Sequence, residues 1–377
     1  MKRRQFLHAA GMVTASLGAA LAGTGASRAQ TAAEGAPGKA EPKPVVWRLV
    51  SDFPEALDTP RAGVEALANT LTAITDGAFT VNAASQPQKT QKQPASALDA
   101  VREGKAEIAY TSTAFYADRD PVFGVGGGMP FGPNARQFSA WLLDRGGLDL
   151  LNDAYRSHGV LALPGGNTGA ITGGWFKQEI AGVEGLAGKR VGVTGTGAAL
   201  LARFGALPQP IPPQDLAAAL TAGRIDIAQW TGPHDDERLG LNKGAPFYYY
   251  PGWQGGLQFS FIIARDAWDA LSAPHRAALT AAAARAHDTV QARYDALNAA
   301  AIRRLVALGT KLRPTPQAMM SQLYTANQAL TAEIADTNPA FRTLSDSVKI
   351  FSTEAYLWWQ VAEYTYDNFM IRVRAQD

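Results

Sequence analysis

The sequence contains two similar segments, ALDAVREGKAEIAY at residues 97–110 and LAAALTAGRIDIAQ at residues 216–229. They align without gaps: a helical pattern is followed by Gly104 or Gly223, then by a basic residue, and then by an acid and an Ile-Ala pair. A glycine after a helix supplies the left-handed residue that ends it, and the Ile-Ala pair enters a buried strand. Two such copies predict two similarly built α/β lobes.

The residues directly after each copy, Tyr110-Thr111-Ser112 and Gln229-Trp230-Thr231, follow the predicted strands. Sheets of α/β proteins place ligands at the carboxyl ends of their strands, so we expect both lobes to face one crevice. Helix, glycine and strand is also a common unit, and chance recurrence is the alternative explanation.

Short apolar runs alternate with helical patterns along the rest of the chain, as in α/β proteins. Strands are predicted over residues 46–50, 79–81, 160–163 and 190–193, and helices over residues 59–75 and 277–308. Residues 352–374 contain neither Gly nor Pro and are also predicted to be helical.

The composition limits the function classes. The chain has 377 residues, of which 46% are hydrophobic and 18% charged, enough for a buried core. Lys2, Arg3, Arg4 and Arg28 precede the first acid, and beyond them 31 basic and 33 acidic residues remain, so the net charge of that part is −2. No nucleic-acid partner is expected from this balance. The absence of cysteine excludes disulfides, thiol nucleophiles and thiolate metal sites.

The first 29 residues predict an export signal. Arg3-Arg4-Gln5-Phe6-Leu7 is followed by a small and apolar stretch over residues 9–22 and by the cleavage pattern Ser27-Arg28-Ala29. This order is typical of a twin-arginine signal; a Sec signal with paired arginines is the alternative. Residues 30–44 predict a linker, and no later run has the length and apolarity of a membrane span.

Several further segments resemble one known family: PGGNTG at 164–169, GGWF at 173–176, WTGPHDDE at 230–237, YYYPGW at 248–253 and AEYTYDNF at 362–369. In this order they are similar to the periplasmic solute receptors of TRAP (tripartite ATP-independent periplasmic) transporters, the DctP-like proteins. Within that family the sequence most resembles the 2-oxo acid (alpha-keto acid) receptors. The similarity extends over nearly the whole chain beyond the export signal.

The resemblance implies a two-lobed α/β clamshell of the periplasmic-binding-protein type, with the ligand cleft between its lobes. Lobe I is expected at residues 45–167 with 257–310, lobe II at 168–256, and a long helical C-terminal region that packs across the lobes at 311–377. The protein is expected to bind a small monocarboxylate in the periplasm, to deliver it to small and large membrane subunits, and to need no cofactor. The C-terminal region is a candidate homodimer surface.

Arg190 is predicted to anchor the ligand. The resemblance implies this role, and an Arg that opens the apolar run RVGV is costly to bury without a partner. Its planar guanidinium suits two parallel hydrogen bonds to a carboxylate. A surface Arg, or one paired with an acid of the protein, is the alternative.

Asn167, Gln229, Trp230 and Trp253 are predicted to surround the ligand. The amide of Asn167 can donate and accept hydrogen bonds, and it follows a Gly-Gly turn where backbone can approach a ligand. Trp230 would cover the apolar part of the ligand. Core packing is the alternative for each Trp.

At two positions the chain departs from the 2-oxo acid receptors. Ile171 stands where they carry Gln, and Gln229 stands where they carry Glu; both positions belong to the site that resembles the family's sodium site. A hard cation prefers oxygen ligands and negative charge. We therefore expect sodium binding to be weakened or absent, and a pocket suited to a more hydrophobic acid than pyruvate.

Two other motifs suggest rival sites. The stretch from Gly195 to Leu200 is an incomplete dinucleotide-binding motif. Its glycines more simply predict a turn that brings the backbone amides of a helix start toward an anion. Asp215, at the place of the motif's acid, is predicted to cap a helix. The run His234 to Glu237 suggests a metal site, but after Pro233 it more simply predicts a helix start.

A receptor used for sensing and an exported enzyme are alternative functions. The enzyme is the weaker of the two, because the sequence offers no recognisable nucleophile and acid/base set.

Overall fold

The structure is a computed structural model that describes residues 44–83 and 96–374. The predicted export signal at 1–29 and residues 30–43 of the predicted linker lie outside the described residues. The first strand, β1 (Val45–Ser51), begins where the folded part was expected to begin.

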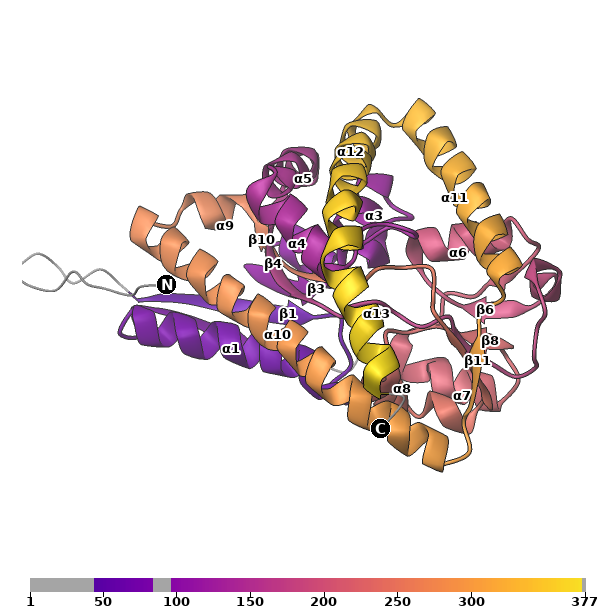
Figure 1. The fold of residues 1–377 in the computed structure, drawn as a ribbon. Helices are drawn as coiled ribbons and strands as arrows, with labels where there is room; N and C mark the ends of the chain where they lie inside the picture. Colours follow the sequence, from indigo (N-terminus) through magenta and orange to yellow (C-terminus); the bar gives the residue numbers. More distant parts are fainter. Residues whose placement is uncertain (1–43, 84–95, 375–377) are drawn as a thin grey trace, which may run out of the picture. The chain divides into compact units, whose positions relative to one another are not determined.

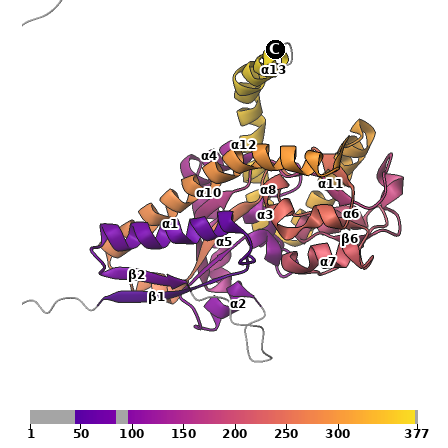
Figure 2. The same cartoon turned by 90° about the horizontal axis from the view of Figure 1, so that it is seen from below.

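Five strands form the first sheet, in the order β2-β1-β3-β10-β4; Figure 1 labels β1, β3, β4 and β10, and Figure 2 labels β2 beside β1. β1, β2 (Phe79–Ala83) and β3 (Ile108–Thr111) are parallel. β10 (Gln258–Ala264) runs antiparallel both to β3 and to β4 (Val160–Asn167). The strands predicted at 46–50, 79–81 and 160–163 are therefore confirmed.

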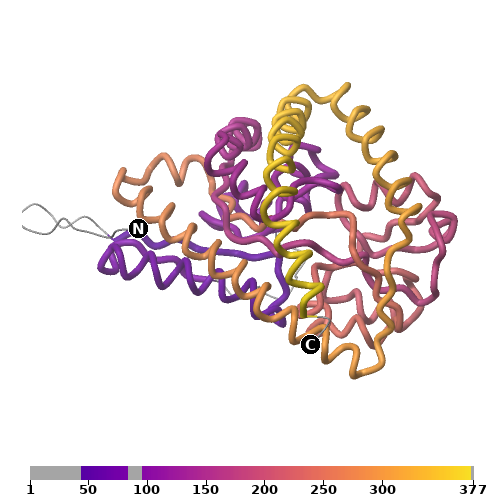
Figure 3. The backbone as a smooth tube through the Cα atoms, in the orientation of Figure 1, coloured from indigo at the N-terminus to yellow at the C-terminus, as the bar shows by residue number. Residues whose placement is uncertain are grey.

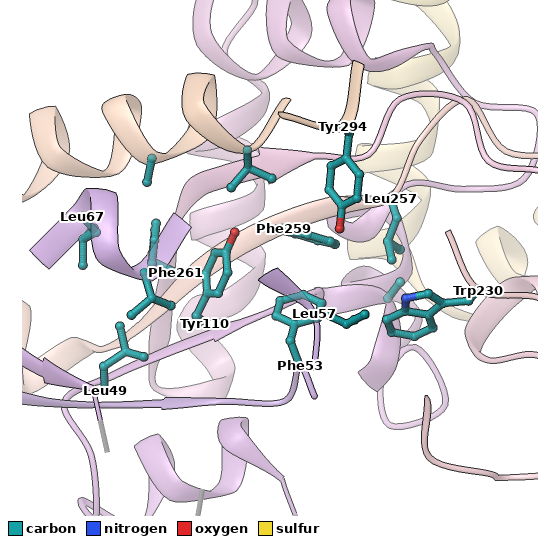
Figure 4. Packing of buried hydrophobic residues seen from close by; sticks show 14 of the residues in the cluster. Leu49, Phe53, Leu57, Leu67, Tyr110, Trp230, Leu257, Phe259, Phe261 and Tyr294 are labelled. Carbon is teal, nitrogen blue, oxygen red and sulfur yellow. The ribbon is translucent and has the colours of Figure 1, made fainter. Parts of the chain in front are cut away.

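Two helices cover this sheet. α1 (Asp58–Ile74) and α10 (Ala273–Ala307) lie side by side, as Figures 1 and 2 show. The apolar positions of α1 at helical spacing, such as Leu67 and Leu71, are buried against the strands. Figure 4 shows Leu49, Tyr110 and Phe261 in the same core. Each such side chain contributes about 1.5–3 kcal/mol by leaving water.

Six strands form the second sheet, in the order β11-β9-β5-β8-β6-β7. Their bounds are β5 (Gly174–Phe176), β6 (Arg190–Gly192), β7 (Leu207–Pro208), β8 (Ile227–Ala228), β9 (Phe247–Tyr250) and β11 (Lys311–Pro314). β5 is antiparallel to β8 and β9, whereas β6 is parallel to β7 and β8.

The two similar segments occupy corresponding places in the two sheets. α2 (Ala97–Arg102) precedes β3, and α7 (Leu216–Thr221) precedes β8. Gly104 and Gly223 share the same left-handed φ of 68°. The prediction drawn from the repeat is thus confirmed: each copy builds one unit of a different sheet.

The chain crosses between the sheets at residues 168–173 and 251–257, and a third time along α10, which contacts both α1 and α8 (Pro233–Leu239) before β11 begins. The strands of the expected lobe I lie in the first sheet and those of the expected lobe II in the second. β11, which was expected to belong to the C-terminal region, joins the second sheet by pairing with β9. The lobe boundaries themselves stay a prediction.

The remaining helices lie around the two sheets. They are α3 (Pro121–Gly127), α4 (Ala135–Asp144), α5 (Gly147–Tyr155), α6 (Gly195–Ala202), α8 (Pro233–Leu239) and α9 (Arg265–Asp269). Short 3-10 turns are η1 (Thr113–Tyr116), η2 (Arg156–His158), η3 (Val183–Leu186), η4 (Pro213–Asp215) and η5 (Leu241–Lys243).

The last three helices of the described residues are α11 (Gln317–Thr337), α12 (Pro339–Val361) and α13 (Glu363–Arg374). α11 contacts α6 beside the second sheet, and α12 contacts α3, α4 and α5 beside the first. Figure 3 shows α12 and α13 following one another along the trace. The predicted helicity of 352–374 is confirmed, with a break at Ala362 that no Gly or Pro marks.

Two helix ends differ from expectation. α10 begins at Ala273 rather than near 277, because the Ser272 side chain accepts a hydrogen bond from the backbone N–H of His275 and Pro274 occupies the first turn. Asp215 precedes α7 as predicted, but its side chain makes no capping hydrogen bond, so that part of the prediction was wrong. None of the helices described has the length and apolarity needed to cross a membrane.

Candidate functional site

The carboxyl ends of β3 and β8 meet. The residues that follow these strands are buried, as expected for a shared edge. The ring of Trp230, after β8, stacks on the ring of Phe115 in η1, after β3, with centroids 5.9 Å apart and planes 21° apart. Figure 4 shows Trp230 beside the apolar cluster that contains Phe53. A candidate site therefore lies where the two sheets approach one another.

Asn167 lies at the end of β4, with only 1% of its surface exposed. Its Nδ2 donates to Oε1 of Gln258 at 3.1 Å, and its Oδ1 accepts from the backbone N–H of Gly169 at 3.0 Å. A Cβ on Gly256 would stand 2.2 Å from that Oδ1, so this close approach requires glycine. The amide of Asn167 thus fixes the crossing segment 168–173 to β10.

Gln229 and Ile171 form hydrogen bonds with residues of the crossing segments 168–173 and 251–257. Nε2 of Gln229 donates to the backbone carbonyl of Thr172 at 2.8 Å. The backbone of Ile171 bonds to Gly252 and Gln254 in the other crossing segment, and its side chain is buried. The structure therefore brings Asn167, Ile171 and Gln229 together around residues 168–173, whereas their role in ligand binding stays a prediction.

Trp253 lies in the second crossing segment and is only 2% exposed. Its carbonyl accepts from the backbone N–H of Phe131 at 2.6 Å, and its ring packs in the core of the second sheet. Core packing, the alternative for this residue, is therefore part of its role.

Arg190 is placed apart from these residues. Nε and Nη2 donate to the two carboxylate oxygens of Asp226 at 3.0 and 2.9 Å, and 42% of the side chain is exposed. These hydrogen bonds lower the pKa of Asp226, which is thereby held ionised. The expected unpaired guanidinium is absent; the structure shows the alternative, an Arg paired with an acid of the protein.

The strand direction explains this placement. Arg190 is the first residue of β6, whereas Gln229 donates its backbone N–H to Gly192, at the other end of that strand. Arg190 and Gly192 are about 7 Å apart along the strand, and the guanidinium points to Asp226, which directly precedes β8, so Arg190 faces the amino-terminal end of these strands. Its role as the ligand anchor stays a prediction, and this position counts against it.

The sequence predicted only a helix start at Asp235 and Asp236, which the structure shows as two buried acids. Pro233 does begin α8, but Asp235 and Asp236 are fully buried. Asp235 Oδ2 accepts hydrogen bonds from the hydroxyls of Thr231 and Tyr294, at 3.1 and 2.7 Å. Burial raises the pKa of Asp235 to about 6.

Asp236 Oδ2 accepts hydrogen bonds from Nε1 of Trp175 at 2.9 Å and from the hydroxyl of Tyr248 at 2.7 Å. Burial raises its pKa to about 7. The two carboxyls thus face different partners, and the described part of the chain contains no group of three His, Asp or Glu side chains arranged for a metal ion. Because Tyr294 is 59 residues from Asp235, no local signal revealed the pairing.

The start of α8 is also tied to α1 and α10. Nε2 of His234 lies 2.8 Å from Oδ1 of Asp58, and Arg238 and Arg293 lie within 3.4 Å of the same carboxylate. The backbone N–H of His234 donates to Asn298 in α10. These contacts hold the segment after Trp230 against the first sheet's helices.

Comparison with known proteins gives consistent matches. A family model described as bacterial extracellular solute-binding protein, family 7, matches residues 50–338. A protein of Nostoc sp., named a monocarboxylate 2-oxoacid-binding periplasmic protein, is 35% identical over 370 residues, which is 98% of this chain and 99% of the relative.

Two solved structures extend the comparison. A TRAP transporter solute-binding protein from Bordetella bronchiseptica, with copurified calcium and picolinate, is 34% identical with a TM-score of 0.85, and the match covers 89% of this chain and 99% of that chain. A TRAP periplasmic solute-binding protein from Pseudoalteromonas atlantica, with sodium and pyruvate, is 29% identical with a TM-score of 0.82, covering 86% and 99%. These matches confirm the two-lobed α/β fold.

Proposed function

Because the chain belongs to family 7 of the bacterial extracellular solute-binding proteins, we propose that it is the periplasmic receptor of a TRAP transporter and that its ligand is a monocarboxylate. The similarity to the Nostoc 2-oxoacid-binding protein along 98% of this chain carries the proposal. The picolinate and pyruvate in the two solved structures support the same ligand class. The receptor would hand the ligand to small and large membrane subunits.

The arrangement of the site supports binding by closure of two lobes. Asn167, Ile171 and Gln229 lie at the crossing segments that join the sheets, and Trp230 reaches across to Phe115. A ligand held there touches both sheets, and its binding would favour the closed form. The tryptophan would exclude water from the apolar part of the ligand.

The pair of Ser139 and His287 is the arrangement among the described residues that most resembles a catalytic nucleophile with its base. The hydroxyl of Ser139 lies 3.1 Å from Nε2 of His287. Nδ1 of that histidine is buried without a hydrogen-bond partner, so no acid orients the ring. This pair does not support the exported-enzyme alternative.

We also propose that the ligand binds without a bridging cation. The related structures hold calcium or sodium together with their ligand. In this chain Ile171 has no side-chain oxygen, and Gln229 is uncharged and already donates to Thr172. These residues do not fit a hard cation, which prefers several oxygen ligands and negative charge. The apolar Ile171 favours acids larger than pyruvate.

A thermal-shift screen tests the ligand class. Pyruvate, 2-oxobutyrate, 2-oxoisovalerate and picolinate are each added to the purified protein in sodium buffer and in choline buffer. At 100 times its dissociation constant, a ligand adds about 2.7 kcal/mol to the free energy of unfolding, which raises the melting temperature. We expect one or more of these acids to do so in both buffers.

Two results would contradict these proposals separately. Stabilisation by neutral sugars alone would exclude the monocarboxylate ligand. Stabilisation by the acids in sodium but not in choline would retain the ligand class and exclude binding without a cation.

We further propose that the C-terminal helices pair two copies of the chain. α12 and α13 expose large apolar side chains, which include Leu357, Trp358, Val361, Phe369 and Ile371. In Figure 2, α13 continues from α12 and projects away from the remaining helices. An exposed apolar patch of this kind marks an interaction surface, and the Bordetella protein is described as a dimer.

Light scattering after size-exclusion chromatography tests the dimer. We expect twice the mass of one chain for the wild type, and a monomer when Leu357 and Trp358 are both replaced by serine. Tyr324→Ser, at an exposed position of α11, is the matched control and should leave the mass unchanged. A monomeric wild type would exclude the proposal.

A further inference from the structure

The start of α6 lies at the candidate site. α6 follows β6 directly, at the edge of the sheet where Gln229 bonds to Gly192. Its N-cap residue, Thr194, makes no capping hydrogen bond, and its first turn contains no acid. Within the described chain, no residue accepts a hydrogen bond from the backbone N–H of Thr196 or Gly197. These donors point out of the helix start, as they do at anion-binding helix termini.

A second donor is aimed at the same place. The side chain of Trp253 is buried, with only 2% of the residue exposed. Its Nε1 has no hydrogen-bond partner among the described residues. It lies 3.5 Å from the position that a Cβ on Gly197 would occupy. A buried donor without an acceptor is costly, and the cost disappears when an acceptor binds.

The glycines at the start of α6 allow close approach to neighbouring residues. Gly195 has a left-handed φ of 62°, and a Cβ there would stand 2.6 Å from the carbonyl oxygen of Ala114 in η1. The start of α6 therefore touches the turn that follows β3 of the first sheet. An anion bound at Gly197 would lie at the junction of the two sheets, where closure encloses it.

We propose that the ligand carboxylate binds at the N-terminus of α6, where it accepts hydrogen bonds from the backbone N–H of Gly197 and from Nε1 of Trp253. This inference rests on the proposed function, since it assumes a monocarboxylate ligand. The positive end of the helix dipole and two uncharged donors replace the guanidinium that the sequence suggested. Arg190 keeps its ion pair with Asp226 and does not contact the ligand.

Calorimetric titration of the purified protein tests the assignment, with the same four acids as probes. Trp253→Phe removes the N–H and keeps an aromatic ring. Gly197→Ala places a methyl group where the anion would lie, 3.3 Å from Val193. Both changes should weaken binding about tenfold or more, the effect of losing a hydrogen bond to a charged group. Arg190→Gln is the control and should change the affinity less than about twofold.

Amide chemical shifts give a readout that does not depend on variants. On saturation of the wild type with the acid that binds most tightly, the amide signals of Thr196 and Gly197 and the indole signal of Trp253 should move the most. Unmoved signals, or variants that bind like the wild type while Arg190→Gln loses binding, would overturn the inference and leave the proposed function intact. A wild type that binds none of the four acids would overturn both.

Discussion

Replacing Gly174 with alanine should lower the free energy of unfolding by about 3 kcal/mol or more and abolish ligand binding. Gly174 has a φ of 102°, which disfavours residues with a side chain. A Cβ there would stand 2.5 Å from the carbonyl oxygen of Ala228, which is backbone and has little freedom to move. The clash falls beside the pairing of β5 with β8, and β8 positions Gln229. Urea denaturation measures the loss of stability.

Gly104→Ala is the matched control. Gly104 also has a positive φ, but no atom lies within 4 Å of the added Cβ. The substitution should therefore lower the free energy of unfolding by only about 1 kcal/mol, the cost of a positive φ for alanine. Equal losses in the two variants would show that the approach of Gly174 to Ala228 does not constrain the sheet.

The free energy of unfolding should also depend on pH through the two buried acids of α8. Burial raises the pKa of Asp236 to about 7 and that of Asp235 to about 6. Between about pH 4 and these values the folded state binds protons that the unfolded state has lost, so stability falls as the pH rises through this window. For each group, this difference between the folded and the unfolded state corresponds to roughly 3–4 kcal/mol of stability.

Asp236→Asn isolates this effect. The amide oxygen can still accept from Trp175 and Tyr248, and the side chain no longer titrates. Urea denaturation between pH 4.5 and 7.5 should give a shallower fall in stability than the wild type shows. Asp336→Asn, at an exposed position, should leave the slope unchanged. A variant slope equal to that of the wild type would mean that Asp236 is ionised in the folded protein.

The sequence predicted those features that depend on local pattern. The repeat located one helix, one left-handed glycine and one strand in each sheet, because helix ends and buried strands have local signatures. Asn167, Ile171 and Gln229 lie around one crossing segment in the structure, and their predicted contact with the ligand stays a prediction. The break at Ala362 had no such signature, since neither Gly nor Pro marks it.

Long-range partners were not predictable in the same way. Arg190 was expected to have no partner in the protein until a ligand carboxylate binds. Asp226, 36 residues later, pairs with it instead, because β6 and β8 are neighbours in the sheet. Asp235 likewise accepts a hydrogen bond from Tyr294 of α10, 59 residues later. In each case the tertiary pairing of elements, rather than local sequence, decides the environment of a charge.

Calorimetric titration in sodium-free choline buffer with a chelator shows whether this protein binds a monocarboxylate without a bridging cation. We expect saturable binding of one or more of pyruvate, 2-oxobutyrate, 2-oxoisovalerate and picolinate, with the same affinity after sodium or calcium is added. Absence of binding by all four acids, or binding that begins only when a cation is added, would contradict it.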